Sequence, residues 1–278
     1  MKSMLPAVCF CLVLPGSYAA QASDAVTATQ FRLLFGLGYG RYESLLAQDP
    51  DRGFYLLPRW QLYYKKFYIE NLDLGLNLVS HQGWSFDLTT KQSFDAMLLR
   101  RHGDQSSLPA GLQVGEGKTP GLFDGLDPAA ADAGGRHYSY LGGFTVLYQH
   151  AGWQLQSALH QDLSGVHQGR EWASEISYAA IAQSLAVQTS LGIRQLDSAY
   201  SNYYFSHPLN GAAPDALPVM PGAQTLSSFK LAASWAVSAK TSLVLNWKRE
   251  YLPRELRRSG LLDKREHDIW FTGVLFQY

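Results

Sequence analysis

Apolar and polar residues alternate along most of the chain with a period of two. In the first run, 31–40, every odd position is apolar, and the even positions carry Arg32, Leu34 and three glycines. Because strand side chains point alternately to two faces, this pattern predicts a β-strand with one apolar face. Similar runs occur at 54–64, 67–78, 84–98, 138–150, 152–163, 170–182, 185–196, 226–237, 242–252 and 269–278. We find no helical periodicity of comparable length.

The final run carries the clearest membrane signal. Its apolar face has an aromatic residue at each end and smaller residues between, and includes Trp270, Val274, Phe276 and Tyr278. About ten residues is the length of a tilted transmembrane strand, and aromatic residues favour the two membrane interfaces. An exposed apolar edge would promote aggregation, so we expect this assembly strand to pair with the first strand and close a barrel.

The connections between runs indicate the strand number. Turns at 151–152, 183–184 and 238–240 are short, whereas 100–137, 197–224 and 253–266 are long, as in bacterial outer-membrane barrels. Eleven is an odd number of strands, which would leave the two termini on opposite sides of the membrane. Apolar residues occupy odd positions before Glu70-Asn71 and even positions after it. This change predicts a hairpin within the 67–78 run. The expected fold is therefore all-β, a transmembrane antiparallel up-and-down β-barrel of about 12 strands, with 10 or 14 as alternatives.

The amino terminus has the features of a secretory signal peptide. Lys2 precedes an apolar segment that ends at Pro15-Gly16, and a small-x-small pattern follows at 20–22. We expect cleavage after Ala22, a short periplasmic tail at 23–30 and an outer-membrane barrel at 31–278. Both cysteines of the chain lie in the predicted signal, so the mature protein would have no thiol chemistry.

Charge excludes one class of partner. The chain has 23 basic and 23 acidic residues, so no global field favours nucleic acid. We find no sequence motif for a metal or a nucleotide and expect no cofactor.

The connection at 161–169 has a distinctive sequence, with Asp162, Ser164, Gly165, His167 and Gly169 at fixed spacing. It resembles the Asp-x-Ser-Gly-Gly-His-x-Gly hairpin of the MipA/OmpV family, with Val166 in place of the second glycine. Other parts agree in order and spacing, namely 36–40, 57–58, 141–144, 203–208 and 273–278.

The resemblance implies an integral outer-membrane barrel. For one member it further implies a scaffold that joins a lytic transglycosylase to a bifunctional penicillin-binding protein during murein growth, and for others osmotic adaptation or adhesion. The implied partners are outer-membrane lipid, lipopolysaccharide and murein synthases or hydrolases. We predict a structural or scaffold role, with a narrow porin or osmoadaptation channel as the alternative.

A third possibility is a hydrolase at the barrel rim. His160, Asp162, Ser164 and His167 supply an acid, a base and a nucleophile within eight residues. The competing interpretation is that Ser164 and Gly165 form a turn whose amides bind Asp162. We favour the turn and predict no catalytic residue.

Charged residues on the inner faces of the runs should line the lumen. Their mixed signs favour mutual pairing over ion selectivity, and a barrel of about twelve strands allows either a narrow pore or a plugged lumen. The predicted lumen-facing residues are Arg32, Asp73, Asp87, Lys91, Asp95, His160, Asp162, Glu175, Arg194, Lys230, Lys248 and Glu250. Basic residues at 254–265 are candidates for lipopolysaccharide phosphates, although acidic residues are interleaved with them.

Overall fold

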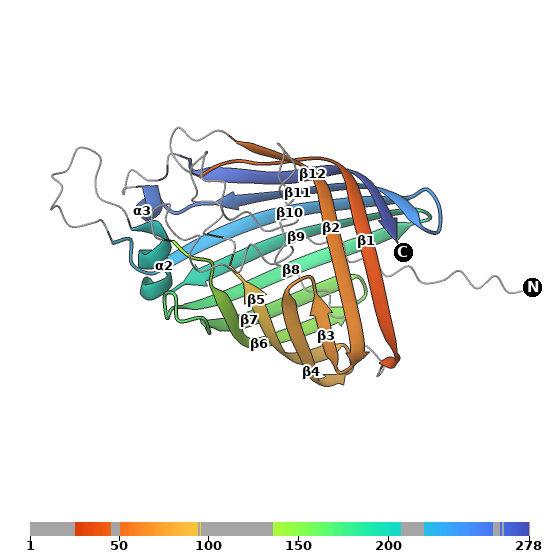
Figure 1. The fold of residues 1–278 in the computed structure, drawn as a ribbon, viewed down its shortest axis with the longest axis horizontal. Helices are drawn as coiled ribbons and strands as arrows, with labels where there is room; N and C mark the ends of the chain where they lie inside the picture. The colour runs from red at the N-terminus through yellow and green to blue at the C-terminus, as the bar shows by residue number, and fades with distance from the viewer. Residues whose placement is uncertain are drawn as a thin grey trace, which may run out of the picture.

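The computed structural model describes residues 26–45, 51–93, 95, 136–206, 220–257, 262 and 264–277. Twelve antiparallel strands form a closed barrel in which each strand pairs with its neighbours in sequence and β1 pairs with β12 (Figure 1). The strands are β1 (Val26–Tyr42), β2 (Arg52–Lys65), β3 (Phe67–Glu70), β4 (Asp73–His81), β5 (Trp84–Gln92), β6 (Tyr140–His150), β7 (Trp153–Asp162), β8 (Arg170–Ala182), β9 (Leu185–Leu196), β10 (Gln224–Ala236), β11 (Thr241–Tyr251) and β12 (Glu266–Gln277). The predicted fold class and strand number are confirmed.

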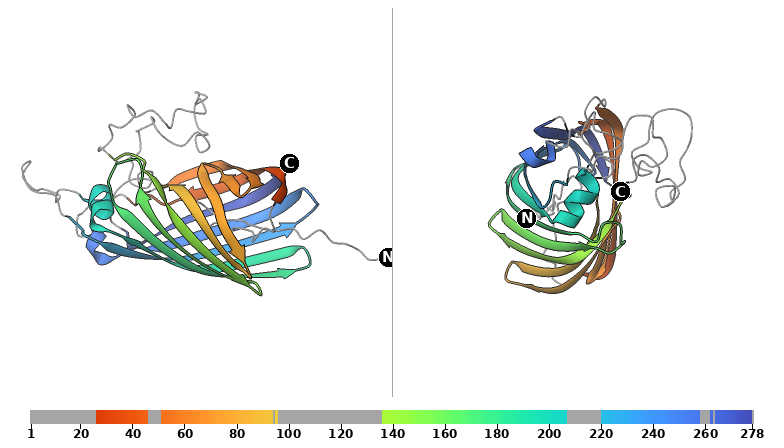
Figure 2. Two further views of the ribbon diagram at one scale, coloured as in Figure 1. Left: turned by 90° about the horizontal axis from the view of Figure 1, so that it is seen from below. Right: turned by 90° about the vertical axis from the view of Figure 1, so that its left-hand side faces the viewer.

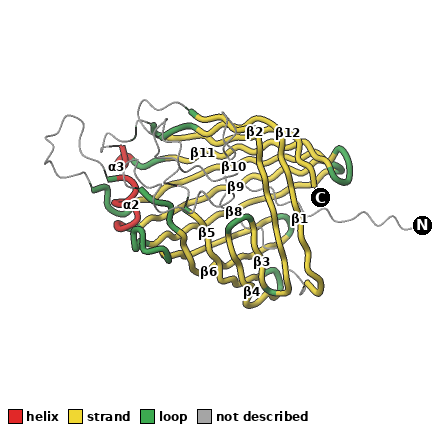
Figure 3. Tube along the Cα trace, viewed as in Figure 1, coloured by secondary structure: helices red, strands yellow, loops and turns green. Residues whose placement is uncertain are grey.

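Two helices of the described residues lie together at one end of the barrel, the end with the longer connections (Figure 3). They are α2 (Ser198–Phe205) and α3 (Arg254–Arg257). Within the described residues, no helix has the length and apolar character needed to cross a membrane.

The hidden hairpin lies where the apolar phase changes. Strands β3 and β4 pair from Phe67↔Leu76 to Glu70↔Asp73, and Asn71 in the turn has a positive φ of 56°. Asparagine tolerates this left-handed conformation better than most residues, which explains why the chain reverses here.

Three predicted boundaries or faces differ from the structure. Strand β1 starts at Val26, so most of the expected tail at 23–30 belongs to the wall. Strand β5 ends at Gln92 instead of residue 98, because Asp95 lies in the barrel and binds Arg194. The alternation of the 54–64 run would put Phe54 on the same face as Leu62 and Tyr64, but Phe54 is buried inside, because the register between β1 and β2 shifts near it.

The outer surface of the barrel is apolar. The five odd residues from Phe31 to Tyr39 are each at least 37% exposed, as a lipid-facing strand requires. Aromatic side chains cluster near both ends of the strands. Tyr39 contacts Tyr55 and Trp270 near one end, and the pairs Trp84–Tyr148 and Trp153–Tyr178 lie near the other.

The assembly strand β12 has the predicted alternation. Trp270, Val274 and Phe276 share one face, and Phe271 and Leu275 are buried on the opposite face. Tyr278, the last residue of the predicted assembly strand, lies outside the described residues.

Part of the lumen beside β1, β2 and β12 is filled by apolar side chains. Phe54 and Phe271 stack with ring centroids 5.7 Å apart, and Leu275 lies in the same cluster. Gly40 makes room for them, because a Cβ atom there would lie 2.3 Å from the Phe54 ring. Glycines on the inner face of β1 therefore admit large rings from the neighbouring strands.

Barrel closure should depend on Gly38. A Cβ atom at this residue would lie 2.1 Å from the carbonyl oxygen of Thr272, and backbone cannot move away as a flexible side chain can. We expect Gly38→Val to abolish the heat-modifiable, compact form on gel electrophoresis. Gly53→Ala is the control, because its Cβ would meet only the Tyr39 ring, at 3.2 Å. A Gly38→Val protein that folds in normal yield would show that close contact between β1 and β12 at Gly38 is not required for closure.

Candidate functional site

Helix α2 lies in one mouth of the barrel. Viewed along the barrel from that end, it sits within the ring of strands (Figure 2). It follows directly after β9, and Asp197 caps its amino terminus by accepting the Tyr200 N–H at 2.9 Å. The other oxygen of Asp197 accepts the Arg170 N–H at 2.8 Å, which ties the helix start to β8. Tyr200 and Tyr204 are fully buried, so α2 is packed into the mouth.

The 163–169 turn beside α2 is organised by Asp162. One carboxylate oxygen accepts the Ser164 N–H at 2.8 Å and the Ser164 hydroxyl at 2.6 Å. The other accepts the N–H groups of His167 at 2.7 Å and Gln168 at 2.9 Å. Four donors on one buried carboxylate hold the turn in a single shape. Gly165 supplies a positive φ of 73° within it.

His167 connects this turn to the helix. Its Nδ1 accepts the Gly169 N–H at 2.9 Å, so Nε2 carries the proton of the neutral ring and lies 3.0 Å from the Ser139 hydroxyl. The ring packs 4.4 Å from the Tyr200 ring, centroid to centroid. Gly169 permits the close approach, because a Cβ atom there would lie 2.4 Å from the Tyr200 nitrogen. The 163–169 turn thus forms the surface on which α2 packs, which we call the helix seat.

The same contacts argue against a Ser–His–acid relay. Ser164 donates its hydroxyl proton to Asp162 directly, with no histidine between them. His160 lies elsewhere in the lumen, where its Nε2 contacts the Thr89 hydroxyl at 2.9 Å. A serine nucleophile needs a histidine base within hydrogen-bond reach. The described side chains arrange these residues as a turn and a lumen contact instead.

A chain of ion pairs anchors the helix to the lumen wall. The Tyr200 hydroxyl donates to Asp95 at 2.7 Å, and Asp95 pairs with the Arg194 guanidinium at 2.5 Å. The Arg194 Nε lies 3.1 Å from Glu171, which also pairs with Lys91. Since an isolated charge inside the barrel would be costly, these groups must be paired. The anchor therefore links α2 to β5, β8 and β9.

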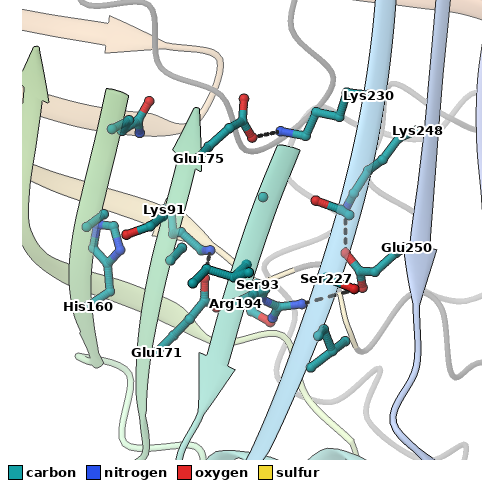
Figure 4. Close-up of a pocket in the computed structure, with 18 of the residues that line it drawn as sticks. Lys91, Ser93, His160, Glu171, Glu175, Arg194, Ser227, Lys230, Lys248 and Glu250 are labelled. Carbon is teal, nitrogen blue, oxygen red and sulfur yellow. Dashed lines mark hydrogen bonds and ion pairs between the residues drawn. The ribbon is translucent and has the colours of Figure 1, made fainter. Parts of the chain in front are cut away.

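A charged cavity of about 160 Å³ lies in the lumen against this network (Figure 4). Lys230 bonds to Glu175 at 2.5 Å, and Lys248 bonds to Glu250 at 2.7 Å. Figure 4 shows both pairs pointing into the same space as Arg194. Nine of the predicted lumen-facing residues line it, namely Asp73, Lys91, Asp95, His160, Glu175, Arg194, Lys230, Lys248 and Glu250.

The other three predicted lumen residues, Arg32, Asp87 and Asp162, do not line this cavity. Asp87 is buried and accepts the Tyr68 hydroxyl at 3.0 Å and the Asn77 amide at 2.6 Å. Arg32 lies on the face of β1 opposite its exposed apolar residues. No group of three or more potential ligand side chains within the described residues could hold a metal ion.

Glu171 is an important residue that the alternation did not identify. Glu171 and Glu175 are four positions apart in β8 and therefore point to the same face, so the alternation could have placed Glu171 in the lumen. Asp197, a common helix-capping residue, could have indicated that a helix begins after β9. The contact between Tyr200 and Asp95 had no sequence signal, because 105 positions separate the two residues.

The turn should weaken in acid. Burial lowers the pKa of His167 below its ordinary value of 6.5, although Asp162 opposes the shift. The unfolded chain therefore binds this proton more readily, and the stability from the neutral ring is present above pH 6.5 and lost as the pH falls below it. We expect the free energy of unfolding to fall between about pH 7.5 and about pH 5.5, and His167→Asn, which keeps an acceptor for Gly169, to reduce that dependence.

His81→Gln, at the exposed end of β4, is the control for this measurement and should retain the wild-type pH profile. If His167→Asn has the same profile as wild type, the turn does not depend on a neutral His167.

Comparisons with known proteins place the chain in a family. No curated protein matches it. The chain resembles solved outer-membrane barrels at low identity. A loop L8 deletion mutant of Vibrio cholerae OmpT is 8% identical, with 90% of this chain and 100% of that chain covered and a TM-score of 0.36. The NanC porin is 8% identical, with 89% and 98% covered and a TM-score of 0.37.

The N-terminal barrel of Pseudomonas aeruginosa OprF is 12% identical, with 50% of this chain and 88% of that chain covered and a TM-score of 0.25. At these scores the fold assignment rests on the strand pairing itself. The family described as MltA-interacting protein MipA matches residues 35–278, which is most of the chain and includes the hairpin, the helix seat and the closing strand. The chain therefore belongs to the MipA family, as its resemblance to MipA/OmpV proteins indicated.

Proposed function

We propose that this protein is a structural or scaffold barrel of the outer membrane that takes part in murein maintenance, and that it does not act as an open pore. The observation that carries the second part is the position of α2. Its buried tyrosines fill one mouth, and the Tyr200 hydroxyl alone contacts Ser93, Asp95 and Arg194. An open porin needs a continuous aqueous path, and α2 occupies its entrance.

The apolar outer surface and the family support the membrane location. Outer-membrane barrels have short periplasmic turns and longer external loops. On this rule the end that carries Gln277 and the turns at 151–152 and 183–184 faces the periplasm, and α2 lies at the external mouth. The predicted signal peptide at 1–22 is the proposed route of export.

The family description supports the scaffold role, because it names an interaction with MltA. We propose murein synthases and hydrolases as the partners. The turns on the periplasmic side are short, so we infer that a partner would contact the barrel wall and several turns together. Lipid surrounds the apolar band. Lipopolysaccharide would meet the external rim, where Lys264 pairs with Asp51 at 3.0 Å and so neutralises part of the basic cluster.

The charged cavity favours one second candidate, a narrow channel that opens when α2 leaves the mouth. Its paired charges would admit small polar solutes without selecting strongly for either sign. The scaffold and the channel differ in whether α2 leaves the mouth of the folded wild-type barrel, and ionic conductance measures this.

The wild-type barrel should be silent in planar bilayers. Tyr200→Ala with Asp95→Ala removes the helix anchor and leaves Arg194 with fewer partners, so we expect frequent, salt-dependent current steps from the double variant. Tyr148→Phe, on the outer aromatic belt, is the control and should stay silent. Stable conductance of the folded wild type would overturn closure by α2 and favour the channel.

Retention of murein enzymes tests the scaffold role directly. Immobilised, folded barrel should retain a purified lytic transglycosylase and a bifunctional penicillin-binding protein, and the two enzymes should be retained together. The control is an unrelated outer-membrane barrel of similar size. If the folded protein retains neither enzyme above that control, the scaffold proposal fails even when the barrel is closed.

A further inference from the structure

The charged cavity is a built feature of the lumen wall. Four small residues that line it come from adjacent strands. Ala158 and Ala173 pair across β7 and β8, and Gly192 and Ser228 pair across β9 and β10. A Cβ atom at Gly192 would lie 2.7 Å from the Ser228 hydroxyl oxygen. Larger side chains at these inward positions would fill the space, so the small residues keep it open.

Glu250 offers one carboxylate oxygen to this cavity. Its Oε2 accepts a hydrogen bond from the Lys248 ammonium at 2.7 Å. Its Oε1 lies 4.0 Å from Nη1 of Arg194, which is beyond hydrogen-bond reach. The part of the chain that the structure describes supplies no hydrogen bond to Oε1. A negatively charged acceptor therefore faces the cavity between two cations.

The two cations retain N–H donors beside this carboxylate. A guanidinium has five N–H groups and an ammonium has three. Among the described contacts, four N–H groups of Arg194 are directed to Asp95 twice, Tyr200 and Glu171. The fifth belongs to Nη1, the nitrogen nearest Glu250. Lys248 directs one of its three to Glu250, and no other partner lies among the described residues. Donors of positive charge thus flank a free acceptor of negative charge.

These groups can be reached by a polar solute. The side chains of Arg194 and Lys248 keep 18% and 19% of their surface exposed although they point into the lumen. Helix α2 fills one mouth, so we infer that a solute enters from the opposite end. Toward that end the inner faces of β8, β9 and β10 carry small uncharged residues, namely Ser177, Ser190 and Ser234. They add neither bulk nor charge to the approach.

The arrangement fits a small ligand that carries both signs of charge. An anion alone would be repelled by Glu250, and a cation alone would be repelled by Arg194 and Lys248. Leu226 and Ile269 are the cross-strand neighbours of these two cations and line the same cavity, so a small apolar group would also find contact. The cavity of about 160 Å³ has room for about five water molecules, which is the size of a small amino acid.

We propose that Arg194, Lys248 and Glu250 form a lumen site for a small zwitterionic amino acid such as alanine. The ligand carboxylate accepts hydrogen bonds from Arg194 and Lys248, and the ligand ammonium donates to Oε1 of Glu250. One bound zwitterion thus bridges the 4.0 Å separation between Arg194 and Glu250 with both of its charges paired (Figure 4). This site goes beyond the scaffold role and does not depend on it.

Equilibrium dialysis of radiolabelled alanine against the folded barrel in detergent micelles tests the site. We expect saturable binding that unlabelled alanine displaces, whereas acetate and ethylammonium, which carry one charge each, displace it far less. Glu250→Gln should weaken alanine binding by about tenfold or more, because the ligand ammonium loses a charged acceptor. Heat-modifiable gel mobility reports whether each variant is folded.

Two further variants complete the test. Ser228→Leu narrows the cavity without changing its charge and should also weaken alanine binding, which keeps the test decisive if Glu250→Gln does not fold. Lys240→Gln, in an exposed turn, is the matched control and should bind like wild type. The proposal is overturned if the folded wild type retains no alanine, if acetate or ethylammonium competes as well as alanine, or if the folded cavity variants bind like wild type. None of these outcomes depends on whether murein enzymes bind.

Discussion

Backbone pairing between β1 and β12 is the constraint on which the rest of the structure depends. A sheet in a bilayer has to satisfy its backbone donors and acceptors internally, and closure removes both edges at once. Gly38 opposite Gly273 allows the two strands to meet closely at the seam. Closure also fixes which face is inside, so every polar side chain of the inner face has to find a partner in a confined space.

The charges inside the barrel then determine the ends of several elements. Arg194 projects inward from β9 and needs an anion, and Asp95 and Glu171 both supply one. Asp95 lies beyond the end of β5 at Gln92, and its pairing with Arg194 is the reason that the strand does not continue. Leaving a buried guanidinium unpaired would cost about 3–5 kcal/mol. Tyr200 joins the same pair, and this contact holds α2 in the mouth.

The sequence predicted the wall well and the contents of the lumen poorly. Alternation with period two is a local signal, so it identified the strands, the closing face at Trp270 and the hairpin at Glu70-Asn71. Phe54 was assigned to the wrong face because a register shift is a property of two strands together. The anchor of α2 was missed because Asp95 and Arg194 are 99 positions apart and neither shows, locally, which charge it will meet.

The family hairpin shows how one local sequence can serve a distant element. Asp162 and His167 shape a turn, yet the surface they form is completed by Tyr200 from α2. Gly165 and Gly169 are required for different reasons, the first for a positive φ and the second for close approach to the helix. Val166 replaces a glycine of the family pattern without conflict, because its φ is not positive and its side chain is only partly buried. The pattern therefore describes the surface on which α2 packs, and a substitution is tolerated at Val166, where the backbone needs no glycine and the side chain is only partly buried.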